Sequence, residues 1–169
     1  MIRHKLSGVG AAMITPFTAD GRIDYEALAS TVDYVIEGGA DYIVALGTTA
    51  ETPTLYMPER AVIAMFISNH IAGRVPLVIG VGGNSTSEVL DQLREFDLRR
   101  ADAILSVTPY YNKPSQEGLY QHFRTVSEHS PVPVILYNIP GRAGVNMSDE
   151  TTLRIARDFG NVIGVKAVS

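Results

Sequence analysis

The sequence of 169 residues contains no cysteine. This absence excludes disulfide bonds and thiolate metal sites, and it leaves the redox compartment open. The four histidines, at positions 4, 70, 122 and 129, do not have the spacing of metal ligands, so we expect no metal. Long apolar runs are also missing: none approaches the ~20 residues of a membrane span, and the run after the N-terminal basic residues is too short for a signal peptide.

The chain also lacks a strong excess of charge. Its net charge of −4 gives no electrostatic reason to expect binding to nucleic acid. Hydrophobic residues make up 46% of the chain and charged residues 19%, which is typical of a folded globular protein. Composition therefore predicts a globular protein without a membrane segment, and we expect it in the cytoplasm.

Six short apolar runs alternate with five helical stretches. The runs are residues 8–14, 41–46, 76–81, 103–107, 132–136 and 161–166. The helical stretches are 24–37, one beginning at Pro58, 87–100, 115–128 and 148–159. Because the apolar runs are continuous rather than alternating, they predict parallel strands buried on both faces and joined by helical crossovers.

Two of the helices show clear end signals or a clear apolar face. Asp24 is a candidate N-cap of the first helix, which Gly38 and Gly39 end. The second helix has Pro58 in its first turn. Its expected buried face consists of Ala61, Val62, Met65 and Phe66.

Two parallel architectures fit this α/β pattern: a doubly wound open sheet and a (β/α)8 TIM barrel. The stretch Gly80–Gly83 lacks the full dinucleotide-binding fingerprint, and no Walker loop is present. Polar residues follow the C-terminal ends of five expected strands, and these ends share one face in a barrel. They are Thr48, Thr49, Asn84, Tyr110, Tyr111, Tyr137, Arg142 and Lys166. Their placement favours the barrel.

Lys166 ends the last apolar run. Burial of an unpaired ammonium is costly, and a buried lysine that becomes neutral can attack a carbonyl to form a Schiff base. The alternative is a strand-end lysine whose head reaches water while its stem packs inside. The other polar residues at the strand ends decide between a Schiff-base lysine and a lysine that reaches water.

Each neighbouring candidate also has an ordinary structural explanation. Tyr137 ends the preceding strand, where its phenol can relay protons or simply pack in the core. Hydroxyls of Thr48 and Thr49 can bind a carboxylate or only stabilise a turn. Arg142 can bind a carboxylate or remain a solvated surface residue.

Tyr110 and Tyr111 lie between Pro109 and Pro114. Paired aromatic residues on a stiff loop suggest a lid or a subunit contact, and core packing of one ring is the competing explanation.

The chain resembles the pyruvate-dependent class I aldolases typified by dihydrodipicolinate synthase and N-acetylneuraminate lyase. The stretches that carry the resemblance are 47–51 (GTTAE), 108–114 (TPYYNKP), 137–142 (YNIPGR) and 164–166 (GVK). Their order and spacing match over essentially the whole chain. The fold that the resemblance implies is a (β/α)8 barrel.

The resemblance also implies roles for individual residues. Lys166 would form the Schiff base with pyruvate, while Thr48, Tyr111 and Tyr137 would form the proton relay. Tyr111 would be supplied across a dimer interface. Thr49 would bind the pyruvate carboxylate and Arg142 that of aspartate semialdehyde; this arginine and the paired tyrosines favour the synthase over the lyase. No cofactor is expected, because pyruvate itself binds covalently.

On this resemblance the protein is a lyase of lysine and diaminopimelate biosynthesis, acting as a homodimer or homotetramer. The alternatives are another pyruvate-dependent aldolase, a keto-deoxy-sugar-acid dehydratase of the same family, or a non-catalytic fragment. Replacement of Arg142 by alanine would distinguish the enzymes.

Positions matching Asn84, Glu88 and Tyr110 bind lysine as a feedback inhibitor in some members. Met57 stands where the family has a histidine in the loop after the second strand, so feedback inhibition by lysine stays open. Ala50 stands where glycine is usual, which matters if its φ is positive. Ala167 replaces the acidic residue that often follows the lysine.

A complete barrel has eight βα units over about 250 residues. Residues 1–169 are therefore expected to be the N-terminal portion of a single barrel domain, truncated to strands 1–6. The last two βα units and the C-terminal helices would be absent, and the first and sixth strands would be open edges. Activity of this truncated chain is doubtful on that expectation, because Lys166 would lack a covering wall.

Overall fold

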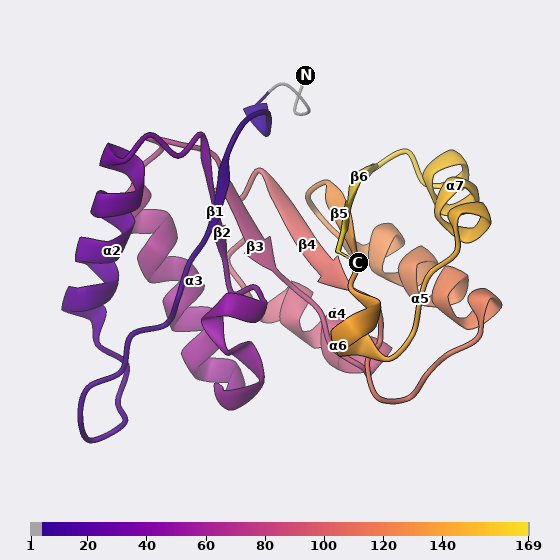
Figure 1. Ribbon diagram of the computed structural model, residues 1–169, viewed down its shortest axis with the longest axis horizontal. Helices are drawn as coiled ribbons and strands as arrows, with labels where there is room; N and C mark the ends of the chain where they lie inside the picture. Colours follow the sequence, from indigo (N-terminus) through magenta and orange to yellow (C-terminus); the bar gives the residue numbers. More distant parts are fainter. Residues whose placement is uncertain (1–4, 169) are drawn as a thin grey trace. The chain divides into compact units, whose positions relative to one another are not determined.

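The computed structural model describes residues 5–168 (Figure 1). The chain forms two compact units. The first contains the residues up to Gly80 together with Phe96–Asp102, and the second contains Val81–Glu95 and the residues from Ala103 onward. Both units are built from parallel strands and helices, as the apolar runs predict.

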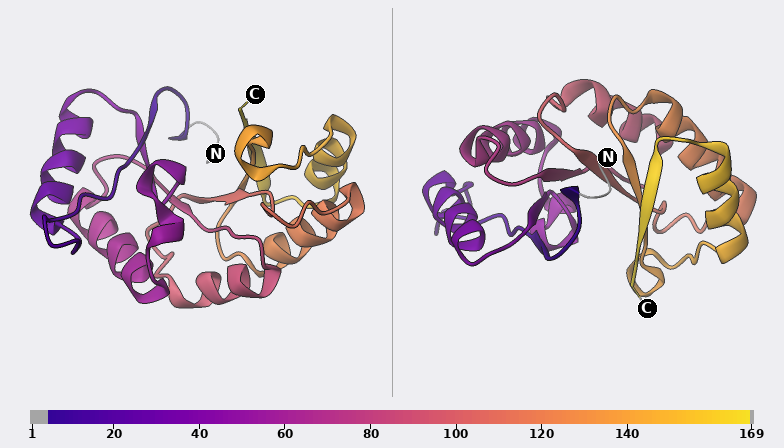
Figure 2. Two further views of the ribbon diagram at one scale, coloured as in Figure 1. Left: turned by 60° about the horizontal axis from the view of Figure 1, so that its bottom comes forward. Right: turned by 90° about the horizontal axis from the view of Figure 1, so that it is seen from above.

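In the first unit, three parallel strands form a sheet with β2 in the middle. The strands are β1 (Gly10–Ala12), β2 (Tyr42–Ala45) and β3 (Leu77–Gly80), and the helices are α2 (Tyr25–Glu37) and α3 (Met57–Ile71). Two 3-10 turns, η1 (Thr48–Ala50) and η2 (Thr52–Thr54), follow β2. Helices α2 and α3 contact each other and lie on one side of the strands (Figures 1 and 2).

Helix α2 has the ends that its sequence predicts. The carboxylate of Asp24 accepts a hydrogen bond from the backbone N–H of Ala27 at 2.9 Å, which satisfies a free donor of the first turn. Leu28 and Val32 are fully buried. The helix ends before Gly38, and the predicted cap is confirmed.

The predicted buried face of α3 is wrong. The structure exposes Val62 and Met65, at 42% and 47% of their surface. The residues that it buries instead are Ile63, Ala64, Ile67, Ser68 and Ile71. Both sets recur at helical spacing and both are largely apolar, so periodicity alone did not distinguish the two faces.

The second unit contains three more parallel strands, with β5 in the middle. They are β4 (Ala103–Val107), β5 (Val134–Asn138) and β6 (Val162–Ala167). The helices are α4 (Thr86–Glu95), α5 (Gln116–His129), α6 (Pro140–Ala143) and α7 (Asp149–Asp158). Helix α5 contacts α4 and α7, and α7 lies beside β6 (Figure 2).

Serine residues cap the N-termini of two helices in this unit, whereas the predicted C-terminal ends of one helix and one strand differ from the structure. Ser115 and Ser148 accept backbone hydrogen bonds at the starts of α5 and α7. The predicted helix 87–100 ends at Glu95, because the Asp97 carboxylate accepts from the N–H of Arg99 at 3.2 Å, a local turn that competes with the helix. Strand β5 extends two residues beyond its predicted end, so Tyr137 lies inside the strand.

Burial differs strongly from strand to strand. Residues of β2 and β3 are almost all buried, whereas five of the six residues of β6 are partly or fully exposed. The exposure of β6 fits the expectation of an open edge. Among the described residues, no helix is long and apolar enough to cross a membrane. That the 169 residues are the N-terminal portion of a single domain stays a prediction.

Candidate active site

Lys166 and Tyr137 face each other across strands β6 and β5. They are register partners in the parallel pair, and the Nζ atom of Lys166 lies 4.6 Å from the centroid of the Tyr137 ring. Register partners on adjacent strands point to the same side of a sheet. The tyrosine is 5% exposed, whereas the lysine is exposed. Residues 5–168 therefore do not supply the burial that favours a neutral amine.

This pairing depends on an irregularity in the ladder between β5 and β6. Val134 pairs with Val162, but the next residue, Ile135, pairs with Gly164. Ile163 is the extra residue, as in a β-bulge. In an uninterrupted ladder Tyr137 would face Val165, and Lys166 would lie on the opposite side. The bulge therefore brings the lysine to the tyrosine.

The start of β6 is held by Asn161. Its Oδ1 atom accepts a hydrogen bond from the hydroxyl of Ser127, and its Nδ2 atom donates to the Ser127 carbonyl at 2.8 Å. The Asn161 carbonyl accepts from the N–H of Val134 at 2.9 Å. This residue fixes β6 to α5 and β5 just before the bulge.

Arg142 lies on the short helix α6, and its side chain is exposed. The loop around it is anchored by Asn138, which bonds to Asn146 at 2.8 Å and accepts from the Met147 N–H at 3.1 Å. Gly144, with φ of +70°, ends the helix in a conformation that suits glycine. The arginine is thus displayed on a fixed loop just after β5.

The loop after β4 carries the paired tyrosines. Tyr110 is half-buried, whereas Tyr111 is 87% exposed and has φ of +71°, which is unusual for a bulky residue. The N–H of Tyr111 donates to the carbonyl of Ala143, the residue after Arg142, at 3.3 Å. Core packing of Tyr111 is therefore excluded, and a role in a subunit contact stays a prediction.

Thr48 and Thr49 belong to the first unit, in turn η1, and both are exposed. The Thr52 hydroxyl fixes the start of this turn by donating to the carbonyls of Leu46 and Gly47, at 2.9 and 3.0 Å. Ala50 is not among the described residues with positive φ; its carbonyl accepts from the buried hydroxyl of Thr15. Alanine in place of the family's glycine therefore introduces no backbone strain there.

The three candidate effector-binding residues all lie in the second unit. Asn84 is half-buried in the loop before α4, and Glu88 is exposed in the first turn of that helix. The carbonyl of Asn84 accepts a hydrogen bond from the side chain of Asn112 at 2.7 Å. Lysine binding by Asn84, Glu88 and Tyr110 stays a prediction.

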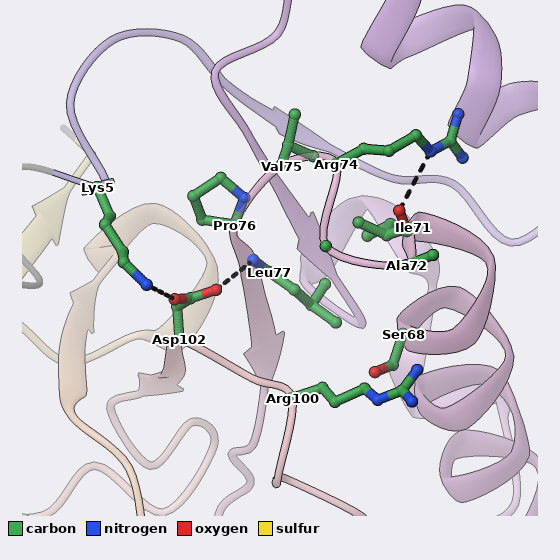
Figure 3. A pocket seen from close by; sticks show the side chains of 11 residues that line it. Lys5, Ser68, Ile71, Ala72, Arg74, Val75, Pro76, Leu77, Arg100 and Asp102 are labelled. Atoms are coloured by element: carbon green, nitrogen blue, oxygen red, sulfur yellow. Dashed lines mark hydrogen bonds and ion pairs between the residues drawn. The ribbon is translucent and has the colours of Figure 1, made fainter.

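Polar features outside the predicted site have structural roles. A cavity of about 650 Å³ in the first unit is lined by residues that include Lys5, Arg100 and Asp102 (Figure 3). Asp102 accepts from the N–H of Leu77 at 3.0 Å and contacts Lys5 at 3.4 Å. None of the predicted site residues lines it.

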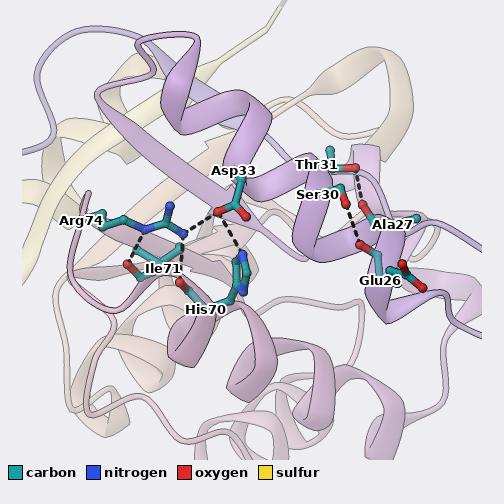
Figure 4. Close-up of polar contacts among 8 residues, drawn as sticks. All are labelled: Glu26, Ala27, Ser30, Thr31, Asp33, His70, Ile71 and Arg74. Atoms are coloured by element: carbon teal, nitrogen blue, oxygen red, sulfur yellow. Dashed lines mark hydrogen bonds and ion pairs between the residues drawn. The ribbon is translucent and has the colours of Figure 1, made fainter.

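An ion-pair cluster joins α2 to the end of α3 (Figure 4). Hydrogen bonds from Arg74 and His70 to the Asp33 carboxylate hold the pKa of that carboxyl below its usual value. His122 of α5 is different, because burial lowers its pKa to about 4. Its Nδ1 atom lies 2.8 Å from the hydroxyl of Thr86.

Within residues 5–168, no cluster of three or more histidine, aspartate or glutamate side chains has the arrangement to hold a metal ion. His4 lies outside the described residues.

The structural roles of three asparagines, and the bulge between β5 and β6, were not predicted from the sequence. Asn112, Asn138 and Asn161 each hydrogen-bond across a loop or a strand end. Asparagine close to an expected strand end was the available signal, since its side chain often bonds to nearby backbone. The bulge had no such signal beyond Gly164.

Comparison with known proteins identifies the family of the chain. The model of the dihydrodipicolinate synthetase family matches residues 5–169. A curated relative, the 4-hydroxy-tetrahydrodipicolinate synthase of Parabacteroides distasonis, is 55% identical over 97% of this chain and 55% of its own length. The chain spans about half the length of such relatives.

Solved structures show the same relationship over nearly the whole chain. The dihydrodipicolinate synthase of Thermotoga maritima superposes with a TM-score of 0.93 at 42% identity, over 98% of this chain and 56% of that protein. The chloride-inhibited Acinetobacter baumannii enzyme complexed with pyruvate gives 0.90 at 43% identity, over 94% and 54%.

The fold is therefore α/β and corresponds to the first six strands of a (β/α)8 barrel, the architecture of the dihydrodipicolinate synthases to which the chain is similar. The chain belongs to the dihydrodipicolinate synthetase family.

Proposed function

We propose that the protein containing this chain is a lyase that condenses pyruvate with aspartate 4-semialdehyde, giving hydroxytetrahydrodipicolinate for lysine and diaminopimelate synthesis. The observation that carries the proposal is the pairing of Lys166 with Tyr137. The names of the relatives support this reaction, and none of those compared above is another aldolase or a dehydratase.

In the proposed reaction, the neutral Nζ atom of Lys166 attacks the carbonyl carbon of pyruvate. The carbinolamine that forms loses its hydroxyl as water, which leaves an imine between lysine and pyruvate. One proton must reach the departing oxygen of the carbinolamine, and a second proton must later leave the pyruvate methyl group. The Tyr137 hydroxyl belongs to the register partner of Lys166 and is the first candidate, and Thr48 and Tyr111 are proposed to complete the relay.

The two substrates each carry a carboxylate. We assign the pyruvate carboxylate to Thr49 and the backbone of its turn. We assign the semialdehyde carboxylate to Arg142, whose exposed guanidinium can bind it with two parallel hydrogen bonds. No cofactor is needed in this scheme, since the imine itself withdraws electrons from the methyl carbon.

A homodimer or homotetramer is part of the proposal. The 87% exposure of Tyr111 on a strained loop supports its use by a second copy of the chain. Binding of lysine at Asn84, Glu88 and Tyr110, and a cytoplasmic location, stay predictions.

Borohydride trapping tests the proposal. The full-length product of the gene is incubated with pyruvate and reduced, and a single adduct on the peptide containing Lys166 is expected by mass spectrometry. Lys166→Arg should abolish the adduct. Lys5→Arg, a matched change at a lysine outside the predicted site, should leave it intact. A coupled assay with aspartate semialdehyde then tests the second substrate; absence of the adduct in the unmodified protein would reject the proposal.

A further inference from the structure

The loop at residues 110–113 holds an unfavourable backbone conformation. Tyr111 has φ of +71° and Lys113 has φ of +50°, although neither is glycine. The N–H of Asn112 donates to the carbonyl of Tyr110 at 2.8 Å, so Tyr111 lies at the centre of a three-residue turn. A turn of this kind with positive φ at its centre is rare and strained. It persists only where surrounding contacts hold it.

Packing of the tyrosine ring does not supply these contacts, because Tyr111 is 87% exposed. The loop is held instead on two sides. On one side the N–H of Tyr111 donates to the carbonyl of Ala143 at 3.3 Å. On the other, the Nδ2 atom of Asn112 donates to the carbonyl of Asn84 at 2.7 Å. The second is the shorter bond, and it comes from the side chain next to the strained residue.

We infer that Asn112 is a positioning residue for Tyr111: its amide, bonded to the Asn84 carbonyl, holds the strained turn that displays the tyrosine. The inference rests on the proposed role of Tyr111 in the proton relay. Asn112 is itself exposed and takes no part in the chemistry. Loss of one exposed hydrogen bond costs little global stability, whereas a displaced relay hydroxyl costs catalytic rate.

The informative substitution is Asn112→Asp. It keeps the size of the side chain and replaces the donor amide with a carboxylate, which is repelled by the Asn84 carbonyl. Asn112→Ala removes the contact without adding a charge. Asn69→Asp is the matched control, because Asn69 is an exposed asparagine of α3 that accepts from Arg100. All variants are made in the full-length product of the gene.

Amide hydrogen exchange tests the positioning independently of activity. We expect exchange of the Tyr111 amide to become roughly tenfold faster in both Asn112 variants, as the turn opens locally. Exchange should be unchanged in Asn69→Asp. The Gly144 amide, which donates to Pro140 at 2.9 Å, is an internal reference. Unchanged exchange at Tyr111 in both Asn112 variants overturns the inference.

A double-mutant cycle tests the consequence for the reaction. We expect Asn112→Asp to lower kcat by roughly tenfold in the unmodified background, and to have almost no effect when Tyr111→Phe is already present, because residues that act through one another are not additive. Equal losses in both backgrounds overturn the inference. Absence of condensation by the unmodified protein rejects the proposed function instead, and the exchange experiment still decides whether Asn112 holds the turn.

Discussion

The ammonium nitrogen of Lys166 lies 4.6 Å from the ring centroid of Tyr137, its register partner on the neighbouring strand. At this distance the cation is attracted to the face of the ring. The ring thus contributes to the orientation of the lysine. The register that pairs them accommodates one extra residue, Ile163, as a bulge in the ladder between β5 and β6.

Deletion of both Ile163 and Gly164 should abolish Schiff-base formation, whereas deletion of Ile163 alone should preserve it. Without Ile163 the ladder becomes regular but still pairs Tyr137 with Lys166, because Gly164 then follows Val162 directly. Removal of Gly164 as well places Ala167 opposite Tyr137 and turns Lys166 to the other side. Borohydride trapping with pyruvate and a thermal melt measure both variants. Undiminished trapping in the double deletion, with a cooperative melt, would show that the register does not position the lysine.

Tyr137→Phe should lower kcat by about 10²–10⁴-fold, the range for removal of a proton-transfer group. The ring that faces Lys166 is retained, so the lysine keeps its orientation. Steady-state kinetics with both substrates measure the change. A variant with unchanged kcat would remove Tyr137 from the relay and favour its explanation as a core aromatic residue.

Much of the fold could be predicted because the sequence signals were local. The caps Asp24, Ser115 and Ser148 act within one helical turn, and the strands read as continuous apolar runs. The face of α3 could not be predicted, since two apolar stripes compete and only tertiary packing chooses between them.

The candidate site was predictable as a set of residue types near strand ends, but not as a geometry. The facing of Lys166 and Tyr137 was expected from simple adjacency of two strands. The structure instead obtains it through a bulge, which shifts the register by one residue. A one-residue shift leaves the local pattern of apolar residues almost unchanged, so no periodicity reveals it.

Gly80→Ala should destabilise the protein by about 1–3 kcal/mol, the usual cost of overpacking. A Cβ atom at this glycine would lie 1.9 Å from the carbonyl oxygen of Leu46, and a backbone atom cannot move aside cheaply. Gly160→Ala is the matched control, because a Cβ there meets nothing within 4 Å. Urea unfolding measures both; equal stabilities would show that β3 shifts to accommodate the methyl group.

Arg142→Ala should lower kcat/KM for aspartate semialdehyde by about 100-fold, since it removes a bidentate partner of the carboxylate. Pyruvate trapping at Lys166 should persist. Arg124→Ala is a suitable control, because Arg124 is an exposed arginine paired with Glu128 on α5. If Arg142→Ala affected pyruvate and the semialdehyde equally, the arginine would not be specific to the second substrate.

His122 should make the protein sensitive to mild acid. Its pKa is lowered from 6.5 to about 4 because burial disfavours the charged imidazole. Between pH 6.5 and pH 4 the unfolded chain binds a proton that the folded protein excludes, so stability falls as the pH falls through this window. From pH 7 to pH 5 the loss of folding stability attributable to this histidine is about 2 kcal/mol.

His122→Gln should remove this part of the pH dependence, whereas His129→Gln, at an exposed position, should retain it. Urea unfolding at pH 7, 6 and 5 measures the slopes, and equal slopes for the unmodified protein and His122→Gln would contradict the prediction.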